Sequence, residues 1–261
     1  MIAVVLLLGL AATFAGWRIW RRLRYSLHIF QLHGYKVGEY TRWAFKRPFD
    51  FLIRRSHVAG AVLLTLATVS AGAVPQKLIA SLLLLGWTLA FASSKRYRSD
   101  NEQKALAWTN RAKRILVAAA VLVFIQVLGG AAGGLVESEP AAAVIRLLFG
   151  FLMADLIAPL TIIAAGILLE PLEALFRSRF KRMARAKLDR HGNLMVIGIT
   201  GSYGKTSVKF ILRDILGFRY NVLATPGSYN TPMGLCRVVN DMLRPEHQIL
   251  IAEMGARYRG D

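Results

Sequence analysis

The stretch "VIGITGSYGKTSVKFILRDIL", residues 196 to 216, decides how the C-terminal part of this 261-residue chain is expected to fold. It opens with an apolar run typical of a buried strand and continues through a turn that contains two glycines. Apolar residues then recur every three or four positions, followed by a glycine placed to end a helix: Val208, Ile211, Leu212, Ile215, Leu216 and Gly217. The stretch therefore predicts a strand, a glycine-rich loop and a helix.

The predicted loop contains the residue types that bind nucleotide phosphates. Such a loop needs glycines that bring backbone N–H groups close to the anion and a helix N-terminus that faces it. It also needs a lysine for the β- and γ-phosphates and a hydroxyl group for Mg²⁺, and Lys205 and Thr206 supply these. The cofactors expected here are ATP and Mg²⁺. The expected cofactor-binding residues are Gly201, Ser202, Tyr203, Gly204, Lys205, Thr206 and Ser207.

The loop departs from the strict pattern G-x-x-x-x-G-K-[ST], which requires glycine at position 199. The chain has Ile199 there, and Gly198 lies one place earlier. We therefore interpret residues 200 to 207 as a variant phosphate loop, and the alternative is a structural glycine turn before an ordinary helix. The elements that follow, "NVLAT", a Pro/Gly/Asn loop, a helical pattern and "QILIAEMG", continue an alternation of strands and helices. This alternation predicts a parallel sheet.

The part of the chain before this domain is apolar enough to predict a multi-span α-helical membrane domain. Hydrophobic residues make up 55% of the chain. Several apolar runs approach the roughly 20 residues that a helix needs to cross a bilayer. Five spans are expected, over residues 1–17, 58–74, 78–92, 115–135 and 147–169. The second and third are short and separated by three residues, so they form either a spanning hairpin or a re-entrant pair.

The location of the positive charge favours a membrane protein over a nucleic-acid-binding protein. The formal net charge is +19, and Lys and Arg number 10 in residues 18–56, 7 in 93–114 and 7 in 171–190. These basic segments alternate with weakly charged loops. The positive-inside rule then places the N-terminus outside and the nucleotide-binding domain on the cytoplasmic side of the membrane. Membrane lipid is thus an expected partner and nucleic acid is not.

Three regions are predicted from these patterns. Residues 1–170 form the membrane domain, residues 171–190 a basic amphipathic connector, and residues 191–261 a partial α/β P-loop domain. The single cysteine and the scattered histidines show no metal-site spacing. Asp155, inside the last apolar run, either pairs within the helix bundle or marks a transport function.

Three motifs in the predicted α/β domain resemble the Mur ligase family. "TGSYGKTS" is similar to the ATP loop of the family, "TPGSYNTPMG" to its Gly/Asn segment, and "ILIAEMGARYRGD" to the strand of the branch that adds D-alanyl-D-alanine. The resemblance covers about 70 residues, 194 to 261. The preceding spans resemble the extension of polytopic family members.

The resemblance implies an ATP-dependent ligase of peptidoglycan precursor synthesis at the bacterial inner membrane. Such an enzyme joins a carboxylate and an amine through an acyl phosphate. The substrates would be a muramoyl peptide and an amino acid or dipeptide. The implied catalytic residues are Lys205, Asn230 and Glu253, and the implied Mg²⁺ ligands are Thr206 and Glu253. Two alternatives need no catalytic role: Glu253 is a surface glutamate at the end of a strand, and Asn230 belongs to a simple turn. The family has a second asparagine at the next position, where this chain has Thr231.

Two departures from the family limit what the resemblance implies. Membrane spans stand where cytoplasmic relatives have a domain that binds a uridine nucleotide, which suggests action at the inner leaflet on a lipid-linked muropeptide. The chain stops at Asp261, so we expect a fragment truncated within the central ATP-binding domain and inactive alone. Two alternative functions stay open. One is a ligase or amidating enzyme that acts on a lipid-linked precursor or another acidic polymer, and the other is a membrane transporter or scaffold with a regulatory nucleotide site.

Overall fold

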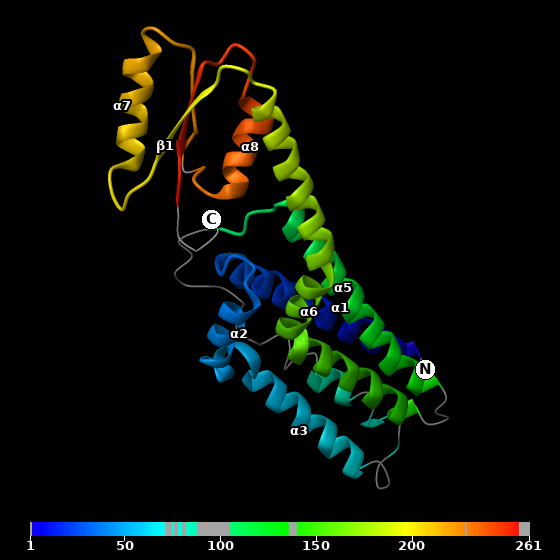
Figure 1. Cartoon of the computed structure of the whole chain (residues 1–261). Coiled ribbons are helices and arrows are strands. Elements are labelled where there is room, and N and C mark those ends of the chain that lie inside the picture. The colour runs from blue at the N-terminus through cyan, green and yellow to red at the C-terminus, as the bar shows by residue number, and fades with distance from the viewer. Residues whose placement is uncertain are drawn as a thin grey trace. The chain divides into compact units, whose positions relative to one another are not determined.

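The computed structural model in Figure 1 describes residues 2–70, 75, 78–79, 82–87, 105–135, 140–227 and 229–255. The chain divides into two compact units, Met1–Glu170 and Pro171–Asp261. The first is helical, and the second contains the strands. We call them the helical unit and the α/β unit.

Helices make up most of the described part of the helical unit (Figure 1). Its elements are α1 (Ile2–Leu32), α2 (Val37–Phe45), the π-helical turn η1 (Pro48–Leu52), α3 (Arg55–Ser70), α5 (Asn110–Leu135) and α6 (Pro140–Asp189) up to residue 170. Alanines and glycines allow these helices to approach closely. A Cβ atom added to Gly166 of α6 would lie 2.9 Å from Cε1 of Phe30 in α1. Small residues at contacts of this kind are typical of helices that pack inside a bilayer.

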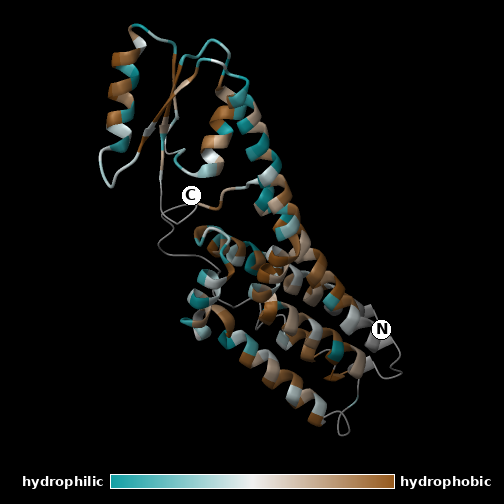
Figure 2. Cartoon of the chain, in the orientation of Figure 1, coloured by the Kyte–Doolittle hydropathy of each residue, from teal (hydrophilic) through white to brown (hydrophobic). Residues whose placement is uncertain are grey.

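The five expected membrane spans are supported only in part. Figure 2 shows hydrophobic colour along the helices of this unit. Among the described residues, two helices are long and apolar enough to cross a membrane, Asn110–Gly130 and Ala142–Asp189. The run at 58–74 begins in α3, whose apolar part is shorter, and the run at 78–92 falls partly outside the described residues. The number of spans therefore stays a prediction.

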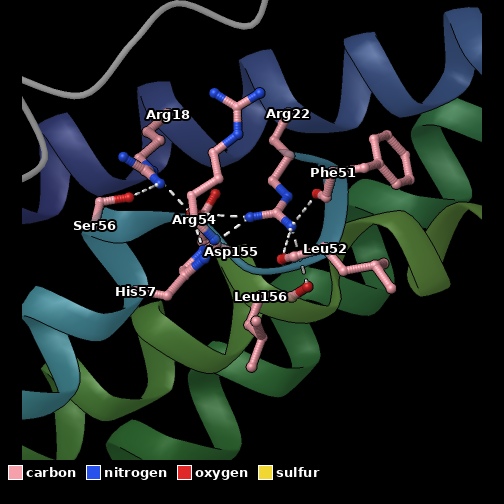
Figure 3. A network of polar contacts seen from close by, with 9 residues as sticks. All are labelled: Arg18, Arg22, Phe51, Leu52, Arg54, Ser56, His57, Asp155 and Leu156. Atoms are coloured by element: carbon pink, nitrogen blue, oxygen red, sulfur yellow. Dashed lines mark hydrogen bonds and ion pairs between the residues drawn. The ribbon is translucent and has the colours of Figure 1, made fainter. Parts of the chain in front are cut away.

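A buried ionic network connects three helices of the helical unit (Figure 3). The carboxylate of Asp155 in α6 accepts from Arg18 Nε of α1 at 2.8 Å and contacts His57 Nε2 of α3 at 2.7 Å. Arg22, one turn after Arg18, lies 3.4 Å from the same oxygen and donates to the backbone carbonyls of Phe51 and Leu52. Asp155 therefore pairs inside the bundle, which was one of its two predicted roles.

The α/β unit has the predicted order of strand, loop, helix, strand, helix and strand. After the end of α6 come β1 (Met195–Ile199), α7 (Lys205–Gly217), β2 (Val222–Ala224), α8 (Pro232–Met242) and β3 (Ile249–Glu253). The strands form a parallel sheet in the order β1-β3-β2, so the parallel sheet is confirmed. β3 is the central strand, and all five of its residues are buried.

The two helices of the α/β unit cover opposite faces of the sheet (Figure 1). Ile249 and Ile251 of β3 pack with Leu212 and Leu216 of α7. Leu250, which points to the other face because side chains alternate along a strand, packs with α8 and with the last turns of α6. Helix α7 ends at Gly217 as predicted, but the apolar face expected for it is only partly covered, because Val208, Ile211 and Ile215 are exposed.

Candidate active site

The glycine-rich loop connects the C-terminal end of β1 to the N-terminus of α7. Gly201 has φ 145° and Gly204 has φ 74°. Both angles lie in the region that disfavours side chains with a Cβ atom, so the loop requires glycine at these two positions. Gly204 is the N-cap residue of α7, and Lys205 and Thr206 are its first two helical residues. The loop thus presents the unpaired N–H groups of a helix N-terminus, as an anion-binding loop does.

The side chains of the expected phosphate lysine and magnesium ligand point in different directions. Lys205 Nζ donates to the carbonyl oxygens of Gly201 and Ser202, so the ammonium group lies over the loop. Thr206 Oγ1 donates to Oε2 of Glu253 at 3.1 Å. The two predicted magnesium ligands are therefore adjacent, although 47 positions separate them in the sequence.

Glu253 reaches the loop because of the strand register. It is the last residue of β3 and pairs with Ile199, the last residue of β1. The carboxyl ends of parallel strands lie at one edge of a sheet, and this edge is the usual location of ligand sites in α/β proteins. Asn230 Nδ2 contacts the second carboxylate oxygen, Oε1, at 3.5 Å. The structure thus places Thr206, Asn230 and Glu253 together, while Lys205 lies on the adjacent loop.

The donor set fits magnesium chemistry. A carboxylate and a threonine hydroxyl are hard oxygen ligands, and Mg²⁺ is usually held by one or two carboxylates together with phosphate and water. No group of three His, Cys, Asp or Glu side chains gathers anywhere in the described ranges. Thr206 and Glu253 would therefore hold the ion jointly with the phosphates of the nucleotide.

Lys209 is the site residue that sequence reasoning missed. It is fully buried, and its Nζ donates to Oε2 of Glu253 at 2.8 Å and to the carbonyl of Gly227 at 2.7 Å. A signal was present in the spacing: Lys209 is three and seven positions before Leu212 and Leu216, which is the spacing of the buried face of α7. A lysine on a buried face needs a partner, and here the partner is the proposed magnesium carboxylate.

The loop between β2 and α8 holds the backbone at and after Glu253. Thr225 Oγ1 accepts a hydrogen bond from the backbone N–H of Glu253 at 3.1 Å. The carbonyl of Asn230 accepts from the N–H of Gly255 at 2.8 Å. Thr231, which stands where the family has a second asparagine, is the N-cap of α8 and accepts from the N–H of Gly234. Its side chain therefore stabilises the helix and is not directed at Glu253.

The neighbours of Glu253 together outweigh the effect of its burial. Burial disfavours the charged carboxylate, but the hydrogen bond and the charge of Lys209 act in the opposite direction, assisted by Thr206 and Asn230. Together they lower the pKa of Glu253 below its ordinary value. The carboxylate is thus kept ionised and ready to bind a cation.

We expect the Lys209→Met substitution to raise the pKa of Glu253, because burial persists after the partner charge is gone. In the wild type the carboxylate stabilises the folded α/β unit above the unfolded pKa near 4.5, and this contribution is lost as the pH falls through the lower folded pKa. A carbon NMR titration of the Glu253 carboxyl group measures its pKa in the wild type and in the Lys209→Met variant. Lys209→Arg keeps the charge and should keep the pKa low. An unchanged pKa in Lys209→Met would show that the ion pair does not control Glu253.

Comparison with known proteins shows what this site resembles. Residues 199–261 match the model of the Mur ligase middle domain. The chain is 46% identical to the UDP-N-acetylmuramoyl-tripeptide–D-alanyl-D-alanine ligase of Treponema pallidum over 68 residues, an alignment that covers 26% of this chain and 15% of that protein. The enzyme of the same name from Bacillus subtilis is 39% identical over 82 residues, 31% of this chain and 17% of that protein.

A third relative with this name, from Synechocystis sp., is 30% identical over 135 residues, 52% of this chain and 25% of that protein. The resemblance to the branch that adds D-alanyl-D-alanine is thus confirmed. The chain spans a quarter or less of the length of these three relatives. No solved structure matches the chain.

Proposed function

We propose that the intact protein is an ATP-dependent ligase of peptidoglycan precursor synthesis that adds D-alanyl-D-alanine to a muramoyl peptide. The observation that carries this proposal is the contact between Thr206 on the glycine-rich loop and Glu253 at the end of β3. It joins a phosphate-type loop to a strand-end carboxylate, in a segment that matches the Mur ligase middle domain. The names of the relatives supply the substrates.

In the proposed reaction, a carboxylate oxygen of the muramoyl peptide attacks the γ-phosphorus of ATP, and ADP leaves. The amine of D-alanyl-D-alanine then attacks the acyl phosphate, and inorganic phosphate leaves as the amide forms. Bound Mg²⁺ would neutralise charge on the phosphates. Catalysis of this kind rests on positioning and electrostatic stabilisation.

The residues of the chain divide these tasks. The loop N–H groups and the N-terminus of α7 bind phosphate oxygens, and the ammonium group of Lys205 moves from the loop carbonyls to the β- and γ-phosphates. Thr206 and Glu253 would hold the metal. Lys209 holds the Glu253 carboxylate in place through its bond to Gly227, and Asn230 is close enough to contact the same carboxylate and a bound substrate.

We also propose that the helical unit lies in the membrane, with the α/β unit on the cytoplasmic side. The support is the large number of exposed apolar side chains on helices of sufficient length, such as Val117, Val121 and Phe124 of α5. A helix that is apolar on all sides belongs inside a protein core or a bilayer. This observation favours a second candidate substrate, a lipid-linked muramoyl peptide.

Amide formation by the intact gene product, reconstituted in lipid with ATP and Mg²⁺, tests both substrates. We expect muramoyl pentapeptide from UDP-muramoyl tripeptide and D-alanyl-D-alanine, detected by mass spectrometry. If product forms only from the lipid-linked tripeptide, the proposed ligase reaction stands and its substrate is the lipid-linked peptide. ATP hydrolysis without amide product from either acceptor would reject the proposed reaction.

A further inference from the structure

A groove on the helical unit lies outside the proposed active site. It has a volume of about 600 Å³ and lies between α1 and the start of α5. Its walls include Trp20, Trp108, Lys113, Val117, Val121 and Phe124. All but one of these side chains are apolar or aromatic, so water solvates the groove poorly.

The two ends of the groove differ in polarity. Lys113, Val117, Val121 and Phe124 are spaced by three or four residues, so they line one face of α5. The positive charge of Lys113 therefore marks one end, and the following two helical turns are apolar. A second positive charge lies at the charged end, where the guanidinium of Arg24 stacks 5.4 Å from the ring centroid of Trp108.

The opposite face of α5 is apolar as well. Ala112, Ile115 and Ala119 are buried in the core of the helical unit, whereas Val117 and Phe124 in the groove are more than 60% exposed. In water, so much exposed apolar surface would be unfavourable, and the helix is long enough to cross a bilayer. Tryptophan and basic side chains at one end of an apolar helix are the pattern of a membrane–water interface.

We propose that this groove binds a single membrane lipid with an anionic phosphate headgroup. The hydrocarbon chain lies along Val117, Val121 and Phe124, and the phosphate faces Lys113 and Arg24. Charge complementarity favours an anionic lipid, because the described walls of the groove carry a basic residue and no acidic one. This inference rests on the membrane location proposed for the helical unit.

Quenching of tryptophan fluorescence by brominated lipid tests the site. The chain is reconstituted in phosphatidylcholine vesicles that contain a minor fraction of brominated phosphatidylglycerol or the same fraction of brominated phosphatidylcholine. We expect the anionic lipid to quench more strongly. The Lys113→Gln and Arg24→Gln substitutions should each reduce this enrichment about fivefold. Lys46→Gln removes an exposed charge outside the groove and should leave it unchanged.

Each result has a distinct meaning. Equal quenching by the two lipids, or enrichment that survives loss of both Lys113 and Arg24, would overturn the proposed site, provided that circular dichroism shows the variants to be folded. No quenching by either brominated lipid would instead reject the membrane location. The ligase proposal is independent of all these outcomes, because it is measured by amide formation.

Discussion

The Lys205→Ala substitution is expected to lower the rate of amide formation by the intact protein about 10²–10³-fold, the usual effect of removing one preorganised charge-stabilising donor. The reason is positional. Lys205 is the first residue of α7 and lies over the glycine-rich loop, where the transferred phosphoryl group would be bound. Its charge acts on the transition state, so kcat should fall more than KM rises. Steady-state kinetics with ADP release and amide product measured in parallel checks the prediction.

Two matched variants define the outcome. Lys181→Ala removes an exposed lysine from α6 of the same unit and should leave the rate unchanged. Lys205→Arg keeps the charge with a different shape and should recover only part of the rate. A Lys205→Ala enzyme that forms amide at the wild-type rate would remove the loop from the mechanism.

The Asp155→Ala substitution is expected to destabilise the helical unit by about 3–5 kcal/mol, the usual cost of breaking a buried ion pair. Arg18 and Arg22 are both nearly inaccessible to solvent, and Asp155 is fully buried between them and His57. Loss of the carboxylate leaves two buried positive charges without their shared counter-charge. Denaturant titration in detergent, followed by circular dichroism, measures the effect.

Glu39→Ala is the matched control for this experiment. Glu39 pairs with Lys36 on the surface of the same unit, and an exposed pair contributes about 0–1 kcal/mol. A similar small loss for Asp155→Ala would show that the network does not stabilise the fold. Asp155→Asn retains the shape of the side chain, and its folded fraction should retain ligase activity, whereas a transporter that uses Asp155 would lose its function.

The sequence predicts local features of the site well. The loop glycines, the helix that begins at Lys205 and ends at Gly217, and the parallel strands all follow from patterns within a few residues of one another. Glu253 was found through its position after the apolar strand "ILIA", where the resembled family places a carboxylate. These features depend on backbone rules, which act locally.

Long-range partners were beyond the reach of one sequence. Pairing of Asp155 was foreseen as a possibility, but its partners lie 98 to 137 positions away on α1 and α3. Lys209 was overlooked because a lysine in an amphipathic helix is normally solvated. The spacing places Lys209 on the buried face of α7, but its partner can be identified only once the register of β3 places the Glu253 carboxylate against α7.

The order of the sheet has a consequence for biosynthesis. β3 follows β1 and β2 in the sequence and lies between them, and those two strands do not pair with each other. Until residues 249–253 have been synthesised, neither outer strand has its partner in this sheet, and their edges are open to wrong pairing. The sheet can close only when β3 arrives, and Glu253 is the final residue of that strand. The contact between Thr206 and Glu253, the pair proposed to bind the metal, can thus form only after β3 has joined the sheet.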